Sequence, residues 1–196
     1  MRIIFVRHGR TRENEKGILQ GHLPGTLSAL GRRQAGAIAA ALEGTRIDRI
    51  YTSDLRRALA TARVIARTHR NAKVVPTKAL RENYLGDMQG TKPKRRFLLD
   101  YMDGRLDKHG VEPPQAFYAR MRKFLVFLAQ KHKNETILLV SHGMTFRFFV
   151  AVIRNKPWRY VRRLKHLQSG EIAIFEVKKK GKFESRLVRK ELLLGS

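Results

Sequence analysis

The sequence predicts an α/β fold, a three-layer α/β/α sandwich around a mainly parallel sheet. Segments patterned like strands alternate with segments patterned like helices, which is typical of a sheet covered by helices on both faces. Two apolar runs, residues 3–6 and 137–140, have the length and composition of strands buried on both sides. With 196 residues and 42% hydrophobic content, the chain can bury one substantial core, and we expect residues 1–196 to form a single domain.

The elements follow in chain order. We expect strands at 3–6, 49–51, 73–75 and 136–140, helices at 30–42, 55–66 and 145–153, a long helix opened by Pro113 and Pro114, and a closing strand pair at 171–177 and 185–188. Helix 30–42 is rich in alanine, and proline is tolerated in the first turn of the long helix. Apolar residues at helical spacing predict two buried faces: Leu55, Leu59, Ala62 and Ala66 in one helix, and Phe117, Met121, Phe124 and Leu128 in the long one.

Each of the two apolar runs delivers a histidine at the end of its strand. Arg7 and His8 follow the first run, and His142 follows the second. Ligands of α/β folds bind at the carboxyl ends of the strands, so both imidazoles are placed for function. A single histidine in such a position is more often a structural residue. Two of them with a neighbouring arginine suggest phosphoryl chemistry.

Five blocks in fixed order strengthen this interpretation. They are Arg7-His8-Gly9-Arg10-Thr11-Arg12-Glu13-Asn14 with Gln20 and Gly21, Leu30-Gly31-Arg32-Arg33-Gln34-Ala35, Ser53-Asp54-Leu55-Arg56-Arg57-Ala58, Leu80 and Glu82 with Gly86 and Gly90, and Ser141-His142-Gly143. Together they resemble the signature of the histidine phosphatase superfamily, the phosphoglycerate mutase-like proteins. Each block alone is a weak signal, but chance does not explain five in order.

The resemblance implies a phosphoglycerate mutase-like fold and a metal-independent hydrolysis of phosphomonoesters through a phosphohistidine. It makes His8 the nucleophile, Glu82 the proton donor, and His142 a protonated group that stabilises the transferring phosphoryl. The residues implied in binding the substrate phosphate are Arg7, Arg57, Asn14, Gln20 and Gly21. Arginine suits this role because its planar fork of donors stays charged and grips two oxygens at once.

Other interpretations stay open at this point. Judged by spacing alone, Glu82 is better explained as a solvated loop carboxylate, and only the family resemblance favours the proton donor; Asn14 is also compatible with a turn residue. The chain lacks the additional segments of the longer cofactor-dependent phosphoglycerate mutases, which favours a phosphatase, with a mutase as the alternative. The loop from His22 to Ser28 also departs from the pattern of the family. A non-catalytic protein that binds polyanions on the same scaffold is the alternative from another class.

Residues 90–114 interrupt the alternation of strands and helices. The family usually carries a variable cap over its pocket here, and we expect such a cap with a short helix at 96–102. Its basic residues are Lys92, Lys94, Arg95, Arg96, Arg105 and Lys108. A solvated surface excursion is the alternative.

The formal net charge of +26 is the most unusual global property. It attracts polyanions and raises encounter rates without determining the fold. A substrate with several negative groups, contact with nucleic acid or a membrane surface, and a generally basic source organism all remain explanations. The basic clusters at 159–165 and 178–182 have only Trp158 and Tyr160 as neighbouring aromatic residues, so little in the sequence supports an RNA-binding surface.

Several features of the sequence exclude further kinds of site and further classes of protein. The chain has no cysteine, no His-x-x-x-His pair and no acidic cluster, so we expect neither disulfides, nor a metal site, nor a cofactor. No secretory signal pattern opens the chain, and the apolar run 148–153 is far shorter than the ~20 residues of a membrane span. We therefore expect a cytoplasmic enzyme whose partner is a small phosphorylated metabolite. The sequence leaves the oligomeric state open.

Overall fold

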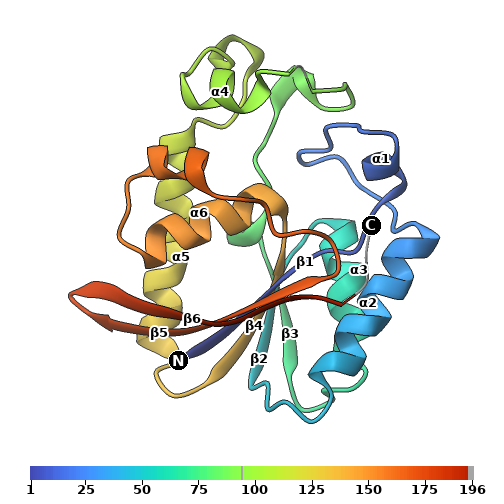
Figure 1. The fold of residues 1–196 in the computed structure, drawn as a ribbon, viewed down its shortest axis with the longest axis vertical. Helices are drawn as coiled ribbons and strands as arrows, with labels where there is room; N and C mark the ends of the chain where they lie inside the picture. Colours follow the sequence, from blue (N-terminus) through green and yellow to red (C-terminus); the bar gives the residue numbers. More distant parts are fainter. Residues whose placement is uncertain (94, 194–196) are drawn as a thin grey trace.

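A six-stranded sheet forms the centre of the computed structural model, which describes residues 1–93 and 95–193 (Figure 1). The strands lie in the order β3-β2-β4-β1-β5-β6. Their bounds are β1 Arg2–Arg7, β2 Arg49–Ser53, β3 Lys73–Thr77, β4 Thr136–Ser141, β5 Glu171–Lys180 and β6 Lys182–Leu192. The first four are parallel to one another, whereas β5 pairs antiparallel with β1, and β6 pairs antiparallel with β5. The predicted α/β fold with a mainly parallel sheet is confirmed, and so is the closing strand pair.

Helices cover both faces of this sheet. Figure 1 shows α2 (Ala29–Leu42) and α3 (Arg56–Ala66) on one side and α5 (Pro114–Lys131) and α6 (Gly143–Ile153) on the other. Alternate residues of β1 serve the two layers: Ile4 and Val6 pack into the α2/α3 cluster, and Ile3 and Phe5 into the α5/α6 cluster. This double burial explains why the strand is a continuous apolar run in the sequence.

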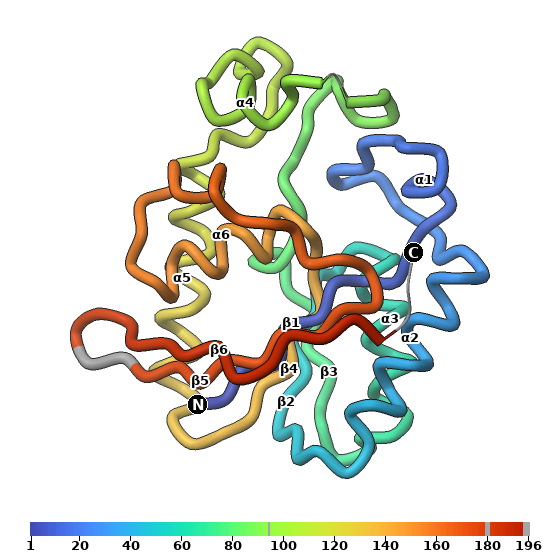
Figure 2. Tube along the Cα trace, viewed as in Figure 1, coloured from blue at the N-terminus to red at the C-terminus, as the bar shows by residue number. Residues whose placement is uncertain are grey.

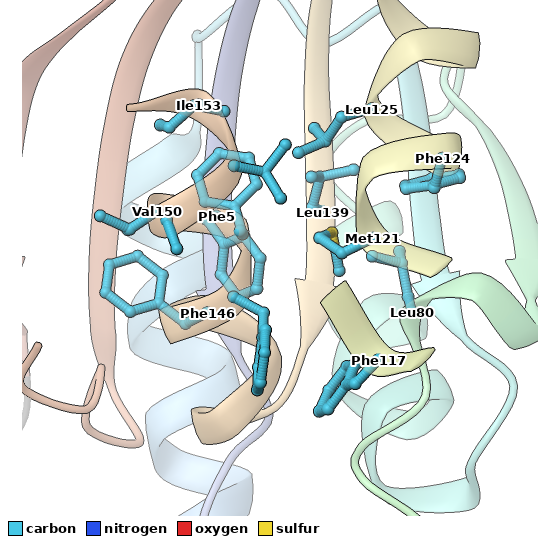
Figure 3. Close-up of a cluster of buried hydrophobic side chains, with 14 of the residues drawn as sticks. Phe5, Leu80, Phe117, Met121, Phe124, Leu125, Leu139, Phe146, Val150 and Ile153 are labelled. Atoms are coloured by element: carbon cyan, nitrogen blue, oxygen red, sulfur yellow. The ribbon is translucent and has the colours of Figure 1, made fainter. Parts of the chain in front are cut away.

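The larger core cluster lies between the sheet and the helices α5 and α6 (Figure 3). The predicted stripe of α5 is buried, since Phe117, Met121 and Leu128 are fully buried and Phe124 is 7% exposed. Burial of each such side chain contributes roughly 1.5–3 kcal/mol to stability. This layer holds β1 and β4 in place beneath the site.

The buried face of α3 differs from the predicted one. Leu55 and Ala62 are buried, but Leu59 and Ala66 are only partly buried, and the buried stripe contains Arg57, Ala58, Thr61, Ala62 and Ile65. The prediction is confirmed for Leu55 and Ala62 and wrong for Leu59 and Ala66, because it followed apolar residues alone. One side of α3 faces polar loops near the site, so its stripe includes an arginine and a threonine.

Short helices connect the main elements. They are α1 (Arg12–Glu15), η1 (Lys78–Leu80), η2 (Gly86–Met88), α4 (Phe97–Met102), η3 (Asp107–His109) and η4 (Trp158–Arg163). Figure 2 shows α4 at the top of the molecule, beyond the sheet. The helix expected at 96–102 is therefore present, while Lys94, one of the basic residues noted in the sequence, lies outside the described residues.

Candidate active site

The two histidines predicted from the strand ends lie side by side. Arg7 of β1 is opposite Ser141 of β4, and the His8 N–H donates to the Ser141 carbonyl at 2.9 Å. Parallel pairing in register therefore brings His8 and His142 to the same sheet edge. Their ring centroids are 5.1 Å apart, at an interplanar angle of 63°. His8 is 3% exposed, and His142 is fully buried.

The hydrogen bonds of His8 define the state of its ring. Nδ1 lies 2.8 Å from the Gly9 carbonyl oxygen, which only accepts, so Nδ1 carries the proton. Nε2 keeps its lone pair, toward which Arg57 Nε donates at 3.3 Å. Burial, reinforced by the charges of Arg57 and Arg7, lowers the pKa of His8 well below its usual value. The ring is therefore neutral at neutral pH.

His142 has a different environment. Neither ring nitrogen has a hydrogen-bond partner within the described part of the chain. Burial lowers the pKa of His142 well below its usual value, and the charges of Arg57 and Arg7 lower it further. The protonated state implied by the family resemblance thus requires a bound anion, because a phosphate dianion is the charge that favours a proton here.

Arg57 is 1% exposed and connects three parts of the site. In addition to His8, its Nη1 donates to the Leu23 carbonyl at 2.9 Å and its Nη2 to the Gly21 carbonyl at 2.7 Å. Each terminal nitrogen carries a second hydrogen for a ligand. Burial lowers the pKa of Arg57 to about 10, so the side chain stays charged at neutral pH.

Arg7, the second arginine of the site, donates a hydrogen bond from its Nη1 to the Leu167 carbonyl at 3.1 Å.

Asn14 and Gln20 converge on Thr11. Asn14 Oδ1 accepts from the Thr11 N–H at 3.2 Å, in a capping box at the start of α1. Gln20 Nε2 donates to Thr11 Oγ1 at 2.9 Å, and Gln20 Oε1 is buried with no hydrogen-bond partner within the described residues. Asn14 thus does act as a turn residue, but both side chains also line the cavity described below.

The carboxylate of Glu82 lies at the N-terminus of α6, on N–H groups of its first turn. Its Oε2 accepts from the Met144 N–H at 3.1 Å, and its Oε1 accepts from the Thr145 N–H at 3.1 Å and the Thr145 hydroxyl at 3.2 Å. A carboxylate is favourable at this end of a helix because the free N–H groups and the helix dipole are positive. Glu82 is therefore a fixed part of the site, not the solvated loop carboxylate of the alternative.

His22 belongs to the loop that departs from the family pattern, and it supports the segment that carries Glu82. Its Nε2 lies 2.9 Å from the Glu82 carbonyl oxygen, and its ring packs against Tyr84 at a centroid distance of 5.2 Å. The loop that differs from the family pattern is therefore connected to the carboxylate through this histidine.

Two glycines permit a close approach of backbones behind His8. A Cβ on Gly9 would lie 2.2 Å from the Gly31 carbonyl oxygen, and one on Gly31 would lie 1.9 Å from the Arg10 oxygen. The Gly9 N–H donates to Thr61 Oγ1 at 3.1 Å, which ties the same turn to α3. These contacts fix the backbone on which the ring of His8 is oriented.

All predicted site residues except His142 line one cavity of ≈ 320 Å³. Asn83, Tyr101 and His166, which no sequence motif indicated, line it as well. Burial lowers the pKa of His166 to about 4, with Arg147 and Arg7 adding to the effect. Residues 1–93 and 95–193 contain no group of three or more histidine or acidic side chains arranged to hold a metal. Within the same residues, no helix has the length and apolarity to cross a membrane.

A model of the histidine phosphatase superfamily (branch 1) matches residues 3–189. The chain belongs to this superfamily. This histidine phosphatase is 36% identical over 155 residues to phosphoglycerate mutase-like protein 4 of Arabidopsis thaliana, an alignment covering 74% of the chain and 67% of that protein. It is 33% identical to the metal-independent phosphoserine phosphatase of the same plant, covering 74% of the chain and 65% of that protein.

Solved structures agree with this assignment over nearly the whole chain. A mycobacterial glucosyl-3-phosphoglycerate phosphatase in complex with VO3 has a TM-score of 0.83 and 27% identity, covering 96% of this chain and 97% of that one. The adenosylcobalamin/alpha-ribazole phosphatase of Escherichia coli is 29% identical in sequence, over 80% of this chain and 81% of that protein. The named phosphatases among its relatives identify this histidine phosphatase as an enzyme.

Proposed function

We propose that the chain hydrolyses phosphomonoesters of small metabolites through a phosphohistidine on Nε2 of His8. The observation that carries the proposal is the state of this ring, because Nδ1 is committed to the Gly9 carbonyl while Nε2 keeps its lone pair. A neutral imidazole nitrogen is the nucleophile that can attack phosphorus in line. The names of the relatives support the same class of reaction.

The proposed reaction has two displacements. In the first, a bond forms between His8 Nε2 and phosphorus, the P–O ester bond breaks, and the departing oxygen takes a proton from Glu82. In the second, water attacks phosphorus, its proton passes to Glu82, and the P–N bond breaks to release inorganic phosphate. Oε2 of Glu82 is the better placed oxygen for this proton, because it accepts one hydrogen bond where Oε1 accepts several.

Positive charge around the phosphoryl group supplies the stabilisation. Arg7 and Arg57 would neutralise the dianion, Asn14 and Gln20 would add amide contacts, and His142 would take up a proton as the dianion arrives. Fixed donors of this kind contribute about 3 kcal/mol each to the transition state. The fork of Arg57 is already held by two carbonyls, which orients its remaining terminal hydrogens for phosphate, while its Nε–H must release the His8 lone pair before that nitrogen attacks phosphorus.

Residues 90–114 would act as a cap over this site. Pro93 and the α4 residues Phe97, Leu98 and Tyr101 line the cavity, which supports this role. Metal independence, the single domain and the cytoplasmic location stay predictions.

The decisive experiment compares wild type, His8→Ala and the control His69→Ala, a partly buried histidine that does not line the cavity, on an alkyl phosphate, with and without chelator. We expect His8→Ala alone to lose turnover and the acid-labile, base-stable adduct trapped by rapid quenching, and the chelator to have no effect. An adduct that persists in His8→Ala would refute the assignment. With 3-phosphoglycerate as substrate, a mutase would yield 2-phosphoglycerate instead of inorganic phosphate.

A further inference from the structure

The cavity extends well beyond the residues proposed to bind phosphate, and this remainder is apolar. Its apolar lining comes from the loop after α1, from the segment before η2, from the cap and from the start of α6; it includes Ile18, Leu19, Leu85, Phe97, Leu98 and Met144. A volume of ≈ 320 Å³ is at the lower end of the range for small-molecule sites. The leaving alcohol of the substrate must occupy this part.

Charged groups are nearly absent from the apolar part. Of the 42 lysines and arginines, only Arg7 and Arg57 line the cavity within the described residues, and Arg57 is bonded to His8. Glu82 is held by α6, and His166 is neutral at pH 7 because burial lowers its pKa to about 4. A carboxylate or ammonium group on the alcohol would therefore lack a counter-ion there, and burying an unpaired charge is costly.

Two polar atoms beside the apolar part lack a hydrogen bond of normal geometry. The side chains of Tyr101 and Asn83 interact with each other and are 2% and 3% exposed, yet neither the Tyr101 hydroxyl nor Asn83 Oδ1 has a partner at hydrogen-bond distance and angle within the described residues. A buried polar atom left unpaired costs about 1–3 kcal/mol. A hydroxyl or amide N–H of a ligand would satisfy the Asn83 oxygen, and the Tyr101 hydroxyl can donate or accept.

We propose that the preferred substrates are phosphomonoesters of uncharged, mainly apolar alcohols that carry one hydrogen-bond donor for Asn83 and Tyr101. This inference rests on the proposed phosphatase activity and specifies its substrate class. It separates this chain from relatives whose names specify phosphoserine or glucosyl-3-phosphoglycerate, because serine and glycerate carry charged groups.

The first test compares phosphate esters of primary alcohols. The set is 2-phenylethyl phosphate, its three ring-hydroxylated derivatives, which are isomers of one another, O-phosphoserine and 3-phosphoglycerate. We expect kcat/KM for 2-phenylethyl phosphate to exceed that for either charged substrate by about 10-fold or more, and at least one hydroxylated isomer to improve on it. A higher kcat/KM for O-phosphoserine or 3-phosphoglycerate would overturn the inference, as would the absence of any gain from the hydroxyl group.

The second test uses variants on one helix. Leu98 lines the cavity, whereas its neighbour Leu99 is 43% exposed and lies outside it. Leu98→Ala should lower kcat/KM for 2-phenylethyl phosphate by about 10-fold, while the matched control Leu99→Ala should change it little. Tyr101→Phe should lower the ratio of kcat/KM between the best hydroxylated isomer and its parent, with Asn83 retaining part of the gain. Equal effects of Leu98→Ala and Leu99→Ala, or an unchanged ratio in Tyr101→Phe, would contradict the proposed binding mode.

The outcomes also separate this inference from the proposed function. If the wild type hydrolyses the charged esters but not the apolar ones, the phosphatase proposal survives and the substrate class is wrong. If it hydrolyses none of the esters, including an activated aryl phosphate, both proposals fail.

Discussion

Arg57 is the side chain on which most of the site geometry depends. It donates to the His8 ring and to the carbonyls of Gly21 and Leu23, so one guanidinium orients the nucleophile and holds the loop that carries Gln20. A lysine has the same charge but no planar fork, so it cannot make all three contacts at once.

We therefore expect Arg57→Lys to lower kcat/KM by about 100-fold even though the charge is retained. The neighbouring residue Arg56 is exposed and supplies the control Arg56→Lys, which should match wild type. Steady-state kinetics on an alkyl phosphate will measure both variants. Activity of Arg57→Lys within a few fold of wild type would show that charge alone is sufficient.

Glu82 is the second residue with a distinct expected signature. If it protonates the departing oxygen, Glu82→Gln should slow hydrolysis of an alkyl phosphate far more than hydrolysis of a nitrophenyl phosphate, whose phenolate leaves without a proton. The variant should also lose about 1 kcal/mol of stability, because an amide caps the α6 N–H groups less well than a carboxylate. Kinetics on the two substrates and urea unfolding measure the two effects. Equal losses on both substrates would leave Glu82 with a positioning role only.

Among the residues of the candidate site, those at strand ends can be predicted from the sequence better than those in loops and in the cap. Arg7, His8 and His142 follow apolar runs, and parallel pairing alone brings the two histidines together. Asn83, Tyr101 and His166 reach the cavity from a loop, from the cap and from the segment after η4, where no periodicity indicates the direction of a side chain. Their positions depend on tertiary packing, which local patterns do not encode.

At the scale of elements, α2 contains two glycines with opposite roles. Gly31 lies against the Arg10 backbone, where a Cβ would come within 1.9 Å of the carbonyl oxygen, whereas a Cβ on Gly36 would have nothing within 4 Å. Gly36→Ala should stabilise the protein by about 0.5–1 kcal/mol through helix propensity. Gly31→Ala should cost about 2 kcal/mol or more and reduce activity, because the turn that carries His8 must move.

Urea unfolding gives the stability of the two variants, and kcat/KM gives their activity. Gly36→Ala is the matched control in the same helix. Equal stability of both variants would show that the approach of α2 to the His8 turn is not tight. Activity matters here as much as stability, because Gly31 does not line the cavity and can affect the reaction only through the backbone.

Comparison of α5 with α3 shows what apolar periodicity captures. In α5 the apolar stripe is the buried stripe, since Phe117 and Met121 face a layer of hydrophobic side chains. In α3 the buried positions include Arg57 and Thr61, because one part of the helix faces the site. A pattern of apolar residues predicts burial in a core and fails where a helix buries polar groups for function.

At the scale of the whole molecule, buried histidines make stability depend on pH. Burial lowers the pKa values of His8, His142 and His166, the last to about 4. Below about pH 6.5 the unfolded chain protonates these rings and the native state does not. The unfolded state then binds more protons, so the free energy of unfolding falls as the pH drops from about 6.5 to about 4, by up to about 1.4 kcal/mol per pH unit for each histidine.

Urea unfolding between about pH 7.5 and about pH 4.5 measures this dependence. Stability should be nearly constant above about pH 6.5, and His166→Gln should lessen the fall below it. A free energy of unfolding that stays constant or rises on acidification would show that these rings accept protons in the native state.

Residues on the two edge strands of the sheet affect whether this protein can pair with strands of neighbouring molecules. The edge strand β3 contains Pro76, which has no N–H to offer another strand, and the edge strand β6 carries Arg186, Arg189 and Lys190 among its residues. Proline and lysine-rich edges discourage strands of separate chains from pairing. The β6 edge is long and also exposes Leu187, Val188 and Leu192, and its charged side chains, which form ion pairs with Glu176, Glu191 and Glu171, disfavour pairing of this strand with the edge strand of a second copy.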